Sequence, residues 1–531
     1  MAKRPNFILF MTDQQRWDHL GCNGNKVLKT PNIDAIAGRG VRFDRFSVTS
    51  AVCMPNRATL VTGRMPSLHG VRYNGVPLTR DSVTFVDLLR AAGYNTGLCG
   101  KSHLQNFSDM EAAISARDDI GAPPPDDLAE ARRGTISGTE YEEEKTPADG
   151  REGYMNLQTP FYGFDHVDLC TRHGDRARGH YDVWLKERHA DADALRGPKN
   201  AIPEPEYSAP QAWHTSIPEE HYTSTYVADK SEAFLDAHAA RTDDAPFFLQ
   251  CSFPDPHHPY TPPGKYFRMY DPDDIDLPGS YHNPAPQPTT AHIQQQTAEG
   301  STPRTGNLPF ATNERETKEI IALTYGMISM VDDCVGRVVE KLESLGLAEN
   351  TVLLFTSDHG DFMGDHGIML KGPLHYQSLI NVPFIWADPA DGLNDVRREE
   401  LAGTIDIART VLARADLAPF NGMQGHDLGP LMRGEADKVR EGMMLEQDAQ
   451  KPNFHFDGPI KARTYLTTRW RLSRYMGSDF GELYDLRNDP LEMNNLWNDP
   501  KHSDVKSDLL SDMVMAMVEN QETSPHPTDF A

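Results

Sequence analysis

Four strand-like apolar runs of the chain end in polar side chains that can bind a metal ion or transfer a proton. These side chains are Asp13 and Gln14 after NFILFMT, Lys101 and His103 after YNTGLCG, His257 and His258 after APFFLQCSF, and Asp358 and His359 after TVLLFTS. In open α/β sheets, ligands bind beyond the carboxyl ends of the strands. We therefore expect these side chains to converge on one site.

Two carboxylates and an imidazole within this set suggest a divalent cation. Asp13, Asp358 and His359 supply oxygen and nitrogen donors that such ions accept, and the amide oxygen of Gln14 is available next to Asp13. An Asp after a strand also often caps a helix or turns the chain, so neither carboxylate alone would indicate a metal. Their occurrence together with His359 favours the metal site.

Cationic and titratable side chains in these segments, together with Arg57 and Lys371 from elsewhere in the chain, suggest an anionic substrate. Arg57, Lys101 and Lys371 would supply positive potential, and His103 and His257 offer imidazoles for proton transfer. Most lysines are exposed to solvent, which is the ordinary alternative for both of these lysines. The chain has a formal net charge of −26, so an anionic substrate would need such a local cationic pocket.

The segment CMPNRATLVTGR, which begins at Cys53, has the pattern of a helix start. Pro55 is tolerated in a first helical turn, and the free N–H groups at a helix N-terminus bind anions. Cys53 is then a buried inert thiol, a thiolate nucleophile activated by the helix end, or the substrate of a modifying enzyme. The residues alone leave these three alternatives open.

Length and composition bound the class of protein. At 531 residues the chain is too long for a single hydrophobic core, which favours one large domain and a smaller one. The acidic charge, without a Lys/Arg-rich run, argues against a nucleic acid or a membrane as partner. The N-terminal apolar run ends at Asp13 and is too short for a membrane span, so we interpret it as a strand and not a signal peptide. Six scattered cysteines without a C-x-x-C pair favour a reducing, cytoplasmic location.

Apolar runs without alternation are separated by helical patterns, for example over residues 80–92 and 314–345, which predicts an α/β sheet covered on both faces. We expect a catalytic domain over residues 1–387 and a smaller domain over 388–531, in which YLTTRWRLSRY and GELYDL have the pattern of antiparallel strands. Two long segments interrupt the first domain, over about residues 109–207 and 262–312. We expect them to set substrate specificity and to mediate a homodimer or a larger homo-oligomer.

At this point the motifs resemble a known family. CMPNR followed by LVTGR resembles the sulfatase signature, C-x-P-x-R with a downstream Thr-Gly, and further blocks such as GYNTGLCGKSHL, TVLLFTSDHGDFMGDHG and LKGPLHYQSLINVPFIW match in the same order. The resemblance covers most of the chain apart from the two interrupting segments. It implies an alkaline-phosphatase-like α/β fold, with a large central sheet between helices and a smaller C-terminal α+β domain that carries a short antiparallel sheet.

The resemblance also implies a chemistry for Cys53. In the sulfatase family a formylglycine-generating enzyme oxidises this cysteine to formylglycine, and one hydroxyl of the hydrated aldehyde attacks sulfur. Asp13, Asp358, His359 and the formylglycine at position 53 would bind one divalent metal, with Gln14 beside them as a substrate contact.

The same comparison gives roles to the remaining polar positions. By analogy, the hydrated aldehyde would be held by Arg57, sulfate oxygens would be bound by Lys101 and Lys371, the catalytic base would be His103, the acid that protonates the leaving oxygen would be His257, and a further contact to the anion would be Asn74. Donors placed in this way would stabilise charge that develops in the transition state.

Two departures from the common family pattern bear on metal and substrate. Gln14 replaces an Asp and His359 replaces an Asn, as in the branch with choline sulfatases and phosphonate monoester hydrolases. We expect calcium first, with manganese or zinc as alternatives because an imidazole is a softer ligand. The Lys101-x-His103 pair, which phosphonate hydrolases lack, favours a sulfate ester.

We therefore expect a sulfatase for a small aryl or alkyl sulfate monoester, with a phosphonate monoester hydrolase or phosphodiesterase as the alternative. A non-catalytic anion-binding protein would have no need of two imidazoles for proton transfer. The leaving group is not specified by any motif. Four aromatic residues could form its pocket or simply pack in the core, namely Tyr162, Tyr181, Trp184 and Trp213.

Overall fold

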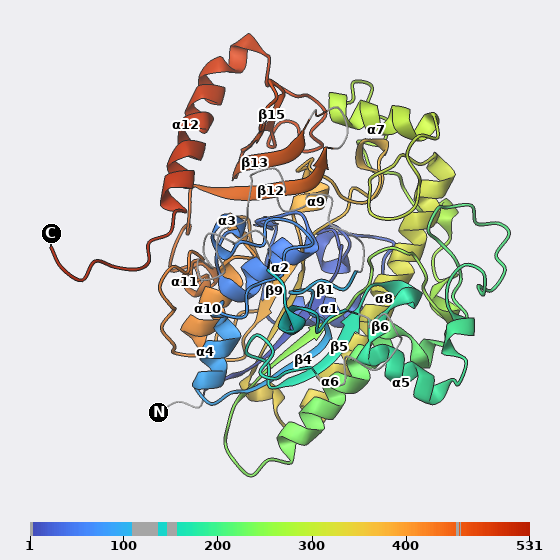
Figure 1. The fold of residues 1–531 in the computed structure, drawn as a ribbon, viewed down its shortest axis with the longest axis vertical. Coiled ribbons are helices and arrows are strands. Elements are labelled where there is room, and N and C mark those ends of the chain that lie inside the picture. Colours follow the sequence, from blue (N-terminus) through green and yellow to red (C-terminus); the bar gives the residue numbers. More distant parts are fainter. Residues whose placement is uncertain (1–3, 109–135, 146–156, 453–455, 457, 531) are drawn as a thin grey trace, which may run out of the picture.

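A computed structural model describes residues 4–108, 136–145, 157–452, 456 and 458–530. Its centre is a mixed sheet formed by β1 (Asn6–Thr12), β2 (Val41–Phe43), β4 (Asn95–Lys101), β5 (His166–Thr171), β6 (Arg178–Gly179), β7 (Phe247–Ser252), β8 (Thr351–Ser357), β9 (Phe384–Ala387) and β10 (Val396–Arg398). The strands lie in the order β10-β2-β9-β8-β1-β7-β4-β5-β6 (Figure 1).

The middle of this sheet is parallel. Strands β8, β1, β7, β4 and β5 run in one direction, whereas β9 and β6 run antiparallel to their neighbours β8 and β5. The register aligns Leu9 of β1 with Gln250 of β7 and Leu354 of β8. The carboxyl ends of the five parallel strands therefore meet at one edge of the sheet, where the predicted polar side chains follow them.

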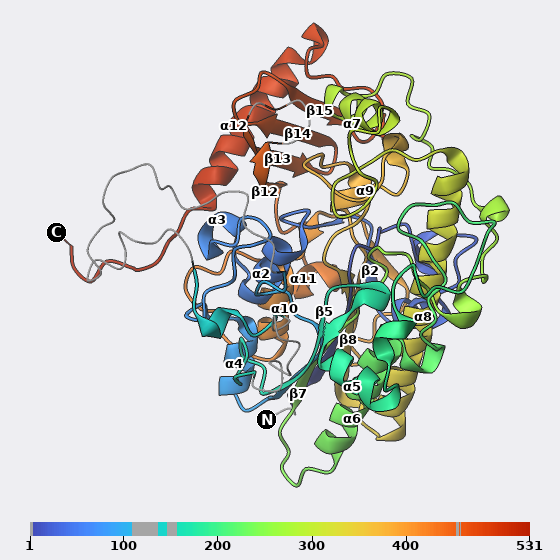
Figure 2. The same ribbon diagram turned by 45° about the vertical axis from the view of Figure 1, so that its right-hand side comes forward.

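Both faces of the sheet are buried. Along β1, Phe7, Leu9 and Met11 belong to one apolar core, and Ile8 and Phe10 belong to the other. The first face is covered by α2 (Cys53–Thr62), α4 (Phe85–Ala91) and α10 (Asp406–Arg414), and the second by α1 (Pro31–Gly38), α5 (His180–Arg188), α6 (Thr223–Ala239) and α8 (Glu314–Ser344) (Figure 2). This double burial explains why the strands show no alternation in the sequence.

A second sheet lies at the C-terminal end of the chain. Its four antiparallel strands are β12 (Gly442–Pro452), β13 (Pro459–Thr467), β14 (Trp470–Tyr475) and β15 (Gly481–Asp485), and helix α12 (Ser503–Glu519) packs against them at the top of Figure 1. The predicted antiparallel strands of the smaller domain are thus confirmed. Among the described helices, none has the length and apolar character that a membrane crossing needs.

The structure departs from the predicted layout in three places. Strands β5 and β6 and helix α5 lie inside residues 109–207, so part of that segment completes the central sheet; residues 109–135 and 146–156 lie outside the described part. Beyond residue 387, β10 still pairs with β2. The helix expected over residues 80–92 begins only at Phe85, because Thr84 and Asp87 form a capping box there. The expected 314–345 helix is confirmed as α8.

Candidate active site

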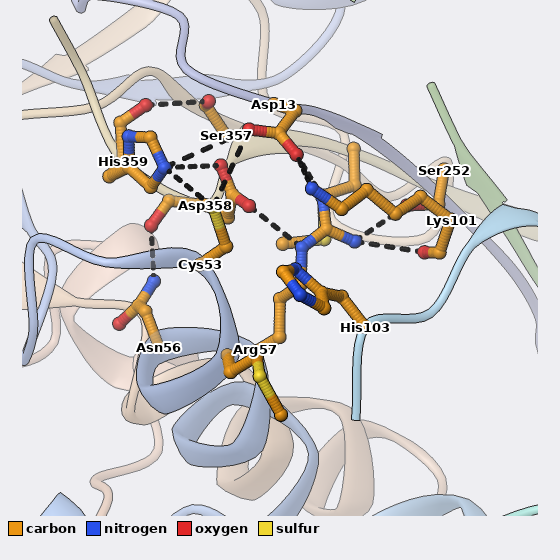
Figure 3. Close-up of polar contacts among 12 residues, drawn as sticks. Asp13, Cys53, Asn56, Arg57, Lys101, His103, Ser252, Ser357, Asp358 and His359 are labelled. Atoms are coloured by element: carbon orange, nitrogen blue, oxygen red, sulfur yellow. Dashed lines mark hydrogen bonds and ion pairs between the residues drawn. The ribbon is translucent and has the colours of Figure 1, made fainter. Parts of the chain in front are cut away.

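The structure brings the predicted polar residues together at the carboxyl edge of the sheet (Figure 3). Asp13 follows β1, Lys101 ends β4, and Asp358 and His359 follow β8. Cys53 enters from the other side as the first residue of α2, a helix that ends at Gly63 with a left-handed φ of 62°. One helix end and several strand ends therefore point at a common centre.

Four side chains form a compact set of possible metal ligands. Each of the four offers one donor atom, and these atoms all lie within 4.8 Å of one another. The residues are Asp13, Cys53, Asp358 and His359, and all are buried. Nε2 of His359 is 3.7 Å from Oδ1 of each Asp, and its Nδ1 donates a hydrogen bond to the Gly360 carbonyl at 2.8 Å. This bond directs the lone pair of Nε2 toward the carboxylates. Two carboxylates and an imidazole so arranged fit a divalent cation.

Arg57 orients the two carboxylates. Its guanidinium donates hydrogen bonds to Asp358 Oδ2 at 2.7 Å and to Asp13 Oδ2 at 3.4 Å, and to the Lys101 carbonyl and the Ser252 hydroxyl at 2.8 and 3.0 Å. From the sequence, Arg57 was expected to hold the group at position 53. In the described structure two of its hydrogen bonds go to the two candidate metal-ligand carboxylates, which a planar guanidinium can bridge.

The two lysines are buried, so the ordinary solvent-exposed alternative does not hold for either. Lys371 Nζ lies 3.2 Å from Cys53 Sγ and 3.0 Å from the Nε2 atoms of both His257 and His359. Lys101 forms an ion pair with Asp13. Burial and Asp13 tend to raise the pKa of the Cys53 thiol, but Lys371, Lys101 and His359 outweigh them and the pKa falls below its usual value. The centre therefore stabilises negative charge at position 53.

The two predicted proton-transfer residues are buried imidazoles. Burial, followed by the positive charge of Lys101, holds the pKa of His103 well below its usual value, so His103 is a neutral base. Burial and the neighbouring imidazoles act in the same direction on the pKa of His257, whose Nδ1 donates to the His258 carbonyl at 2.6 Å. The negative charge of a bound ester would raise the pKa of His257 and favour its acidic form.

Gln14 and Asn74 also reach the site. The Gln14 amide oxygen accepts a hydrogen bond from Lys371 at 3.1 Å, and its NH2 group donates to Asp361. Asn74 Oδ1 accepts the backbone N–H of Met54 at 3.1 Å and so caps the helix end next to Cys53. Gln14 orients a lysine and Asn74 holds the helix; a contact of either with substrate stays a prediction.

Comparison with known proteins decides the family. Residues 5–417 match the sulfatase family model, and residues 364–519 match the model of the C-terminal region of N-sulphoglucosamine sulphohydrolase. The chain belongs to the sulfatase family. It is 26% identical over 525 residues to an arylsulfatase of Clostridium perfringens, which covers 98% of this chain and 95% of that protein. It is 25% identical over 511 residues to a choline-sulfatase of Rhizobium meliloti, which covers 94% of this chain and 83% of that protein.

Solved structures support the fold of this sulfatase. The phosphonate monoester hydrolase of Agrobacterium radiobacter superposes with a TM-score of 0.74 at 24% identity and covers 98% of this chain and 96% of that chain. The expected alkaline-phosphatase-like architecture is thereby confirmed. As a family member with an assembled site, the protein is a sulfuric ester hydrolase, and the non-catalytic binding protein weighed from the sequence is set aside.

His173 is a site residue that was not predicted from the sequence. Its Nε2 lies 2.7 Å from Lys101 Nζ and 3.6 Å from Asp13 Oδ2, and its ring stacks on that of His257 with centroids 3.5 Å apart. His173 follows β5 just as the predicted residues follow their strands. The run HVDLCT before it was a usable signal, but it lay in a segment interpreted as an insertion.

The four aromatic candidates for the leaving-group pocket behave as ordinary packing residues. Tyr162, Tyr181 and Trp184 belong to the two apolar cores, and the indole N–H of Trp213 donates to Asp175 at 2.7 Å. Among the described residues, Phe107 places an aromatic ring at the site: it stacks on His103 with ring centroids 4.1 Å apart, and its centroid lies 5.9 Å from that of His173.

Loss of a carboxylate ligand should weaken metal binding. We expect Asp358→Asn to lower the affinity for calcium or manganese at least about tenfold, because a ligand charge and the acceptor for Arg57 are both removed. Isothermal titration of the metal-stripped protein measures this affinity. The exposed Asp395→Asn is the control. Equal metal affinity in Asp358→Asn and wild type would contradict the assigned ligand set.

Loss of His173 should impair turnover. We expect His173→Ala to lower kcat/KM for a sulfate ester about tenfold or more, because Lys101 loses its imidazole neighbour and His257 loses its stacking partner. His166→Ala, at the first residue of β5 and with a half-exposed side chain bonded to Asp168, should leave kcat/KM unchanged. Wild-type kinetics in His173→Ala would exclude His173 from the active site.

Proposed function

We propose that this sulfatase hydrolyses a small aryl or alkyl sulfate monoester, with Cys53 converted to formylglycine and one divalent cation bound beside it. The observation that carries the proposal is the position of Cys53. Cys53 is the first residue of α2 and of the C-x-P-x-R motif. Its Sγ lies 3.1 Å from His359 Nε2 and 3.2 Å from Lys371 Nζ. Because Cys53 is buried in the folded protein, a formylglycine-generating enzyme would have to act on this segment before the chain folds.

Each neighbouring residue has a role in this proposal. Asp13, Asp358 and His359 would hold the cation, with calcium expected first and manganese or zinc as alternatives. When bound, the cation supplies a positive charge that polarises the ester oxygens. Lys101 and Lys371 would bind sulfate oxygens, and their burial strengthens that attraction.

Proton transfer would fall to the two imidazoles. His103 is buried, and burial and the charge of Lys101 hold its pKa well below the usual value, so the imidazole is unprotonated near neutral pH and has a free lone pair for a proton. His257 would donate a proton to the leaving oxygen after a bound anion has raised its pKa, which burial, the neighbouring imidazoles and Lys371 otherwise hold well below the usual value. Imidazoles that are neutral in the free protein suit an ester that brings its own negative charge.

A phosphonate monoester hydrolase is the second candidate. The observation that favours it is the metal pair Asp358-His359 with Gln14, and the A. radiobacter phosphonate monoester hydrolase shares the fold. Against it stands the ion pair of Lys101 with Asp13, which fixes a cation beside His103. A fixed cation at this point can bind one of the three non-bridging oxygens of a sulfate monoester, whereas a phosphonate monoester has only two such oxygens.

Location and assembly remain proposals. The six cysteines are all free, which agrees with the expected reducing cytoplasm. We also propose a homodimer or a larger homo-oligomer, because the long segments over about residues 109–207 and 262–312 could mediate subunit contacts.

Substrate profiling tests the proposed function. We expect kcat/KM for para-nitrophenyl sulfate to exceed that for para-nitrophenyl phenylphosphonate by at least about 100-fold, because the lysine pair is arranged for a sulfate group. Cys53→Ala should abolish both activities. A preference for the phosphonate ester would transfer the assignment to the second candidate.

A further inference from the structure

Glu144 is a buried carboxylate that binds three successive backbone amides. Its Oε2 accepts the N–H of His103 at 2.8 Å, and its Oε1 accepts the N–H groups of Leu104 and Gln105 at 2.9 and 3.0 Å. The residue is completely buried. Successive N–H groups that converge on one anion form a nest. The loop that carries His103 is therefore wrapped around the Glu144 carboxylate.

Burying the Glu144 carboxylate costs free energy that its hydrogen bonds must offset. Among the described residues no cation forms an ion pair with Glu144, so hydrogen bonds from the loop, chiefly from its backbone amides, compensate its charge. Burial raises the pKa of Glu144 to about 7, and the amide hydrogen bonds oppose this rise. Both carboxylate oxygens act as acceptors, as the ionised form requires. A buried acid that is bound by a loop backbone points to a role in fixing that loop.

His103 needs such a support. Its backbone has a left-handed φ of 59°, which is unfavourable for a residue with a side chain. Within the described structure Nδ1 of His103 has no hydrogen-bond partner, and the ring is held by its stack on Phe107. The backbone hydrogen bond to Glu144 is thus a main constraint on a ring that lies beside Arg57 and Lys101 (Figure 3).

Glu144 is itself held by its neighbours in the strap, which we define as residues 138–145. Gln105 donates to the Glu140 carbonyl at 2.8 Å and accepts the Glu143 N–H at 3.0 Å. The Tyr141 hydroxyl accepts the N–H of Arg80 at 3.1 Å. The strap is therefore tied both to the His103 loop and to the body of the protein.

We propose that Glu144 is a positioning residue that holds the 103–105 loop so that the His103 imidazole faces the reacting group. This role rests on the proposed function, in which His103 is the catalytic base. The strap lies within residues 109–207, in which the sequence analysis found no catalytic motif, and Glu144 supports His103 from there. Glu144 touches no reacting group and acts through His103 alone.

A double-mutant cycle tests this coupling. We expect Glu144→Gln, which replaces an acceptor oxygen by an NH2 group, to lower kcat/KM for para-nitrophenyl sulfate about 10- to 100-fold. In a His103→Ala background the same change should alter kcat/KM less than about twofold, because the residue that Glu144 positions is already absent. Glu142→Gln is the control, since its exposed side chain pairs with Lys145 in the same strap.

Hydrogen exchange tests, independently of activity, whether Glu144 holds the 103–105 loop through the three backbone hydrogen bonds, which we call the clamp. We expect the amides of residues 103–105 to exchange at least about tenfold faster in Glu144→Gln than in wild type or Glu142→Gln. Unchanged exchange would overturn the clamp. A second outcome would overturn the energetic coupling between Glu144 and His103. In it, the amides exchange faster, but Glu144→Gln lowers kcat/KM by the same factor in the His103→Ala background as in wild type. If thermal unfolding shows that Glu144→Gln is not folded, Glu144→Asp takes its place. Its side chain is one methylene group shorter, so the carboxylate lies farther from the amides of residues 103–105, and we expect the same results.

A failure of the proposed function gives a different result. In that case the wild-type protein, with metal bound and Cys53 modified, would not hydrolyse the sulfate ester, whereas the exchange rates in Glu144→Gln would still rise. That pattern would overturn the catalytic role of the clamp and leave its geometry established.

Discussion

The active site depends on compensation of buried charge at the carboxyl edge of the sheet. Asp13 and Asp358 have no solvent exposure, and an uncompensated buried carboxylate would cost several kcal/mol. Arg57 binds both, and Lys101 pairs with Asp13. Because Arg57 lies one turn after Cys53 in α2, the same hydrogen bonds that stabilise the carboxylates also fix the helix end against the strands. Position 53 is thus placed by electrostatics as much as by packing.

Beyond that compensation the centre carries surplus positive charge. Lys371 approaches Cys53 and two imidazoles, and the pKa of the thiol is lowered although burial and Asp13 act against it. The chain as a whole has a formal charge of −26, so this potential is local and is created by a few buried side chains. An anionic ester and a divalent cation suit such a site together, because each offsets the charge that the other brings.

The sequence predicts the part of this site that follows simple rules. Asp13, Lys101 and Asp358 could be found because polar residues after buried parallel strands meet at one edge. His173 obeys the same rule, but the run HVDLCT contains the polar residues His166 and Asp168 and lies in a segment interpreted as an insertion, so its strand was not recognised. Glu144 could not be found, because its partners are backbone amides of residues about 40 positions away and no side-chain pattern records such a contact. The contacts of Arg57 with two carboxylates likewise arise only from tertiary packing.

In the proposed function, position 53 becomes the nucleophile by modification. The most direct measurement is mass spectrometry of the peptide that contains Cys53, from protein produced in an aerobic host and treated with an aldehyde-reactive hydrazide. The account predicts a hydrazone at position 53 in the active fraction and its absence in Cys53→Ala. An unlabelled thiol in protein that turns over a sulfate ester at an undiminished rate would contradict it.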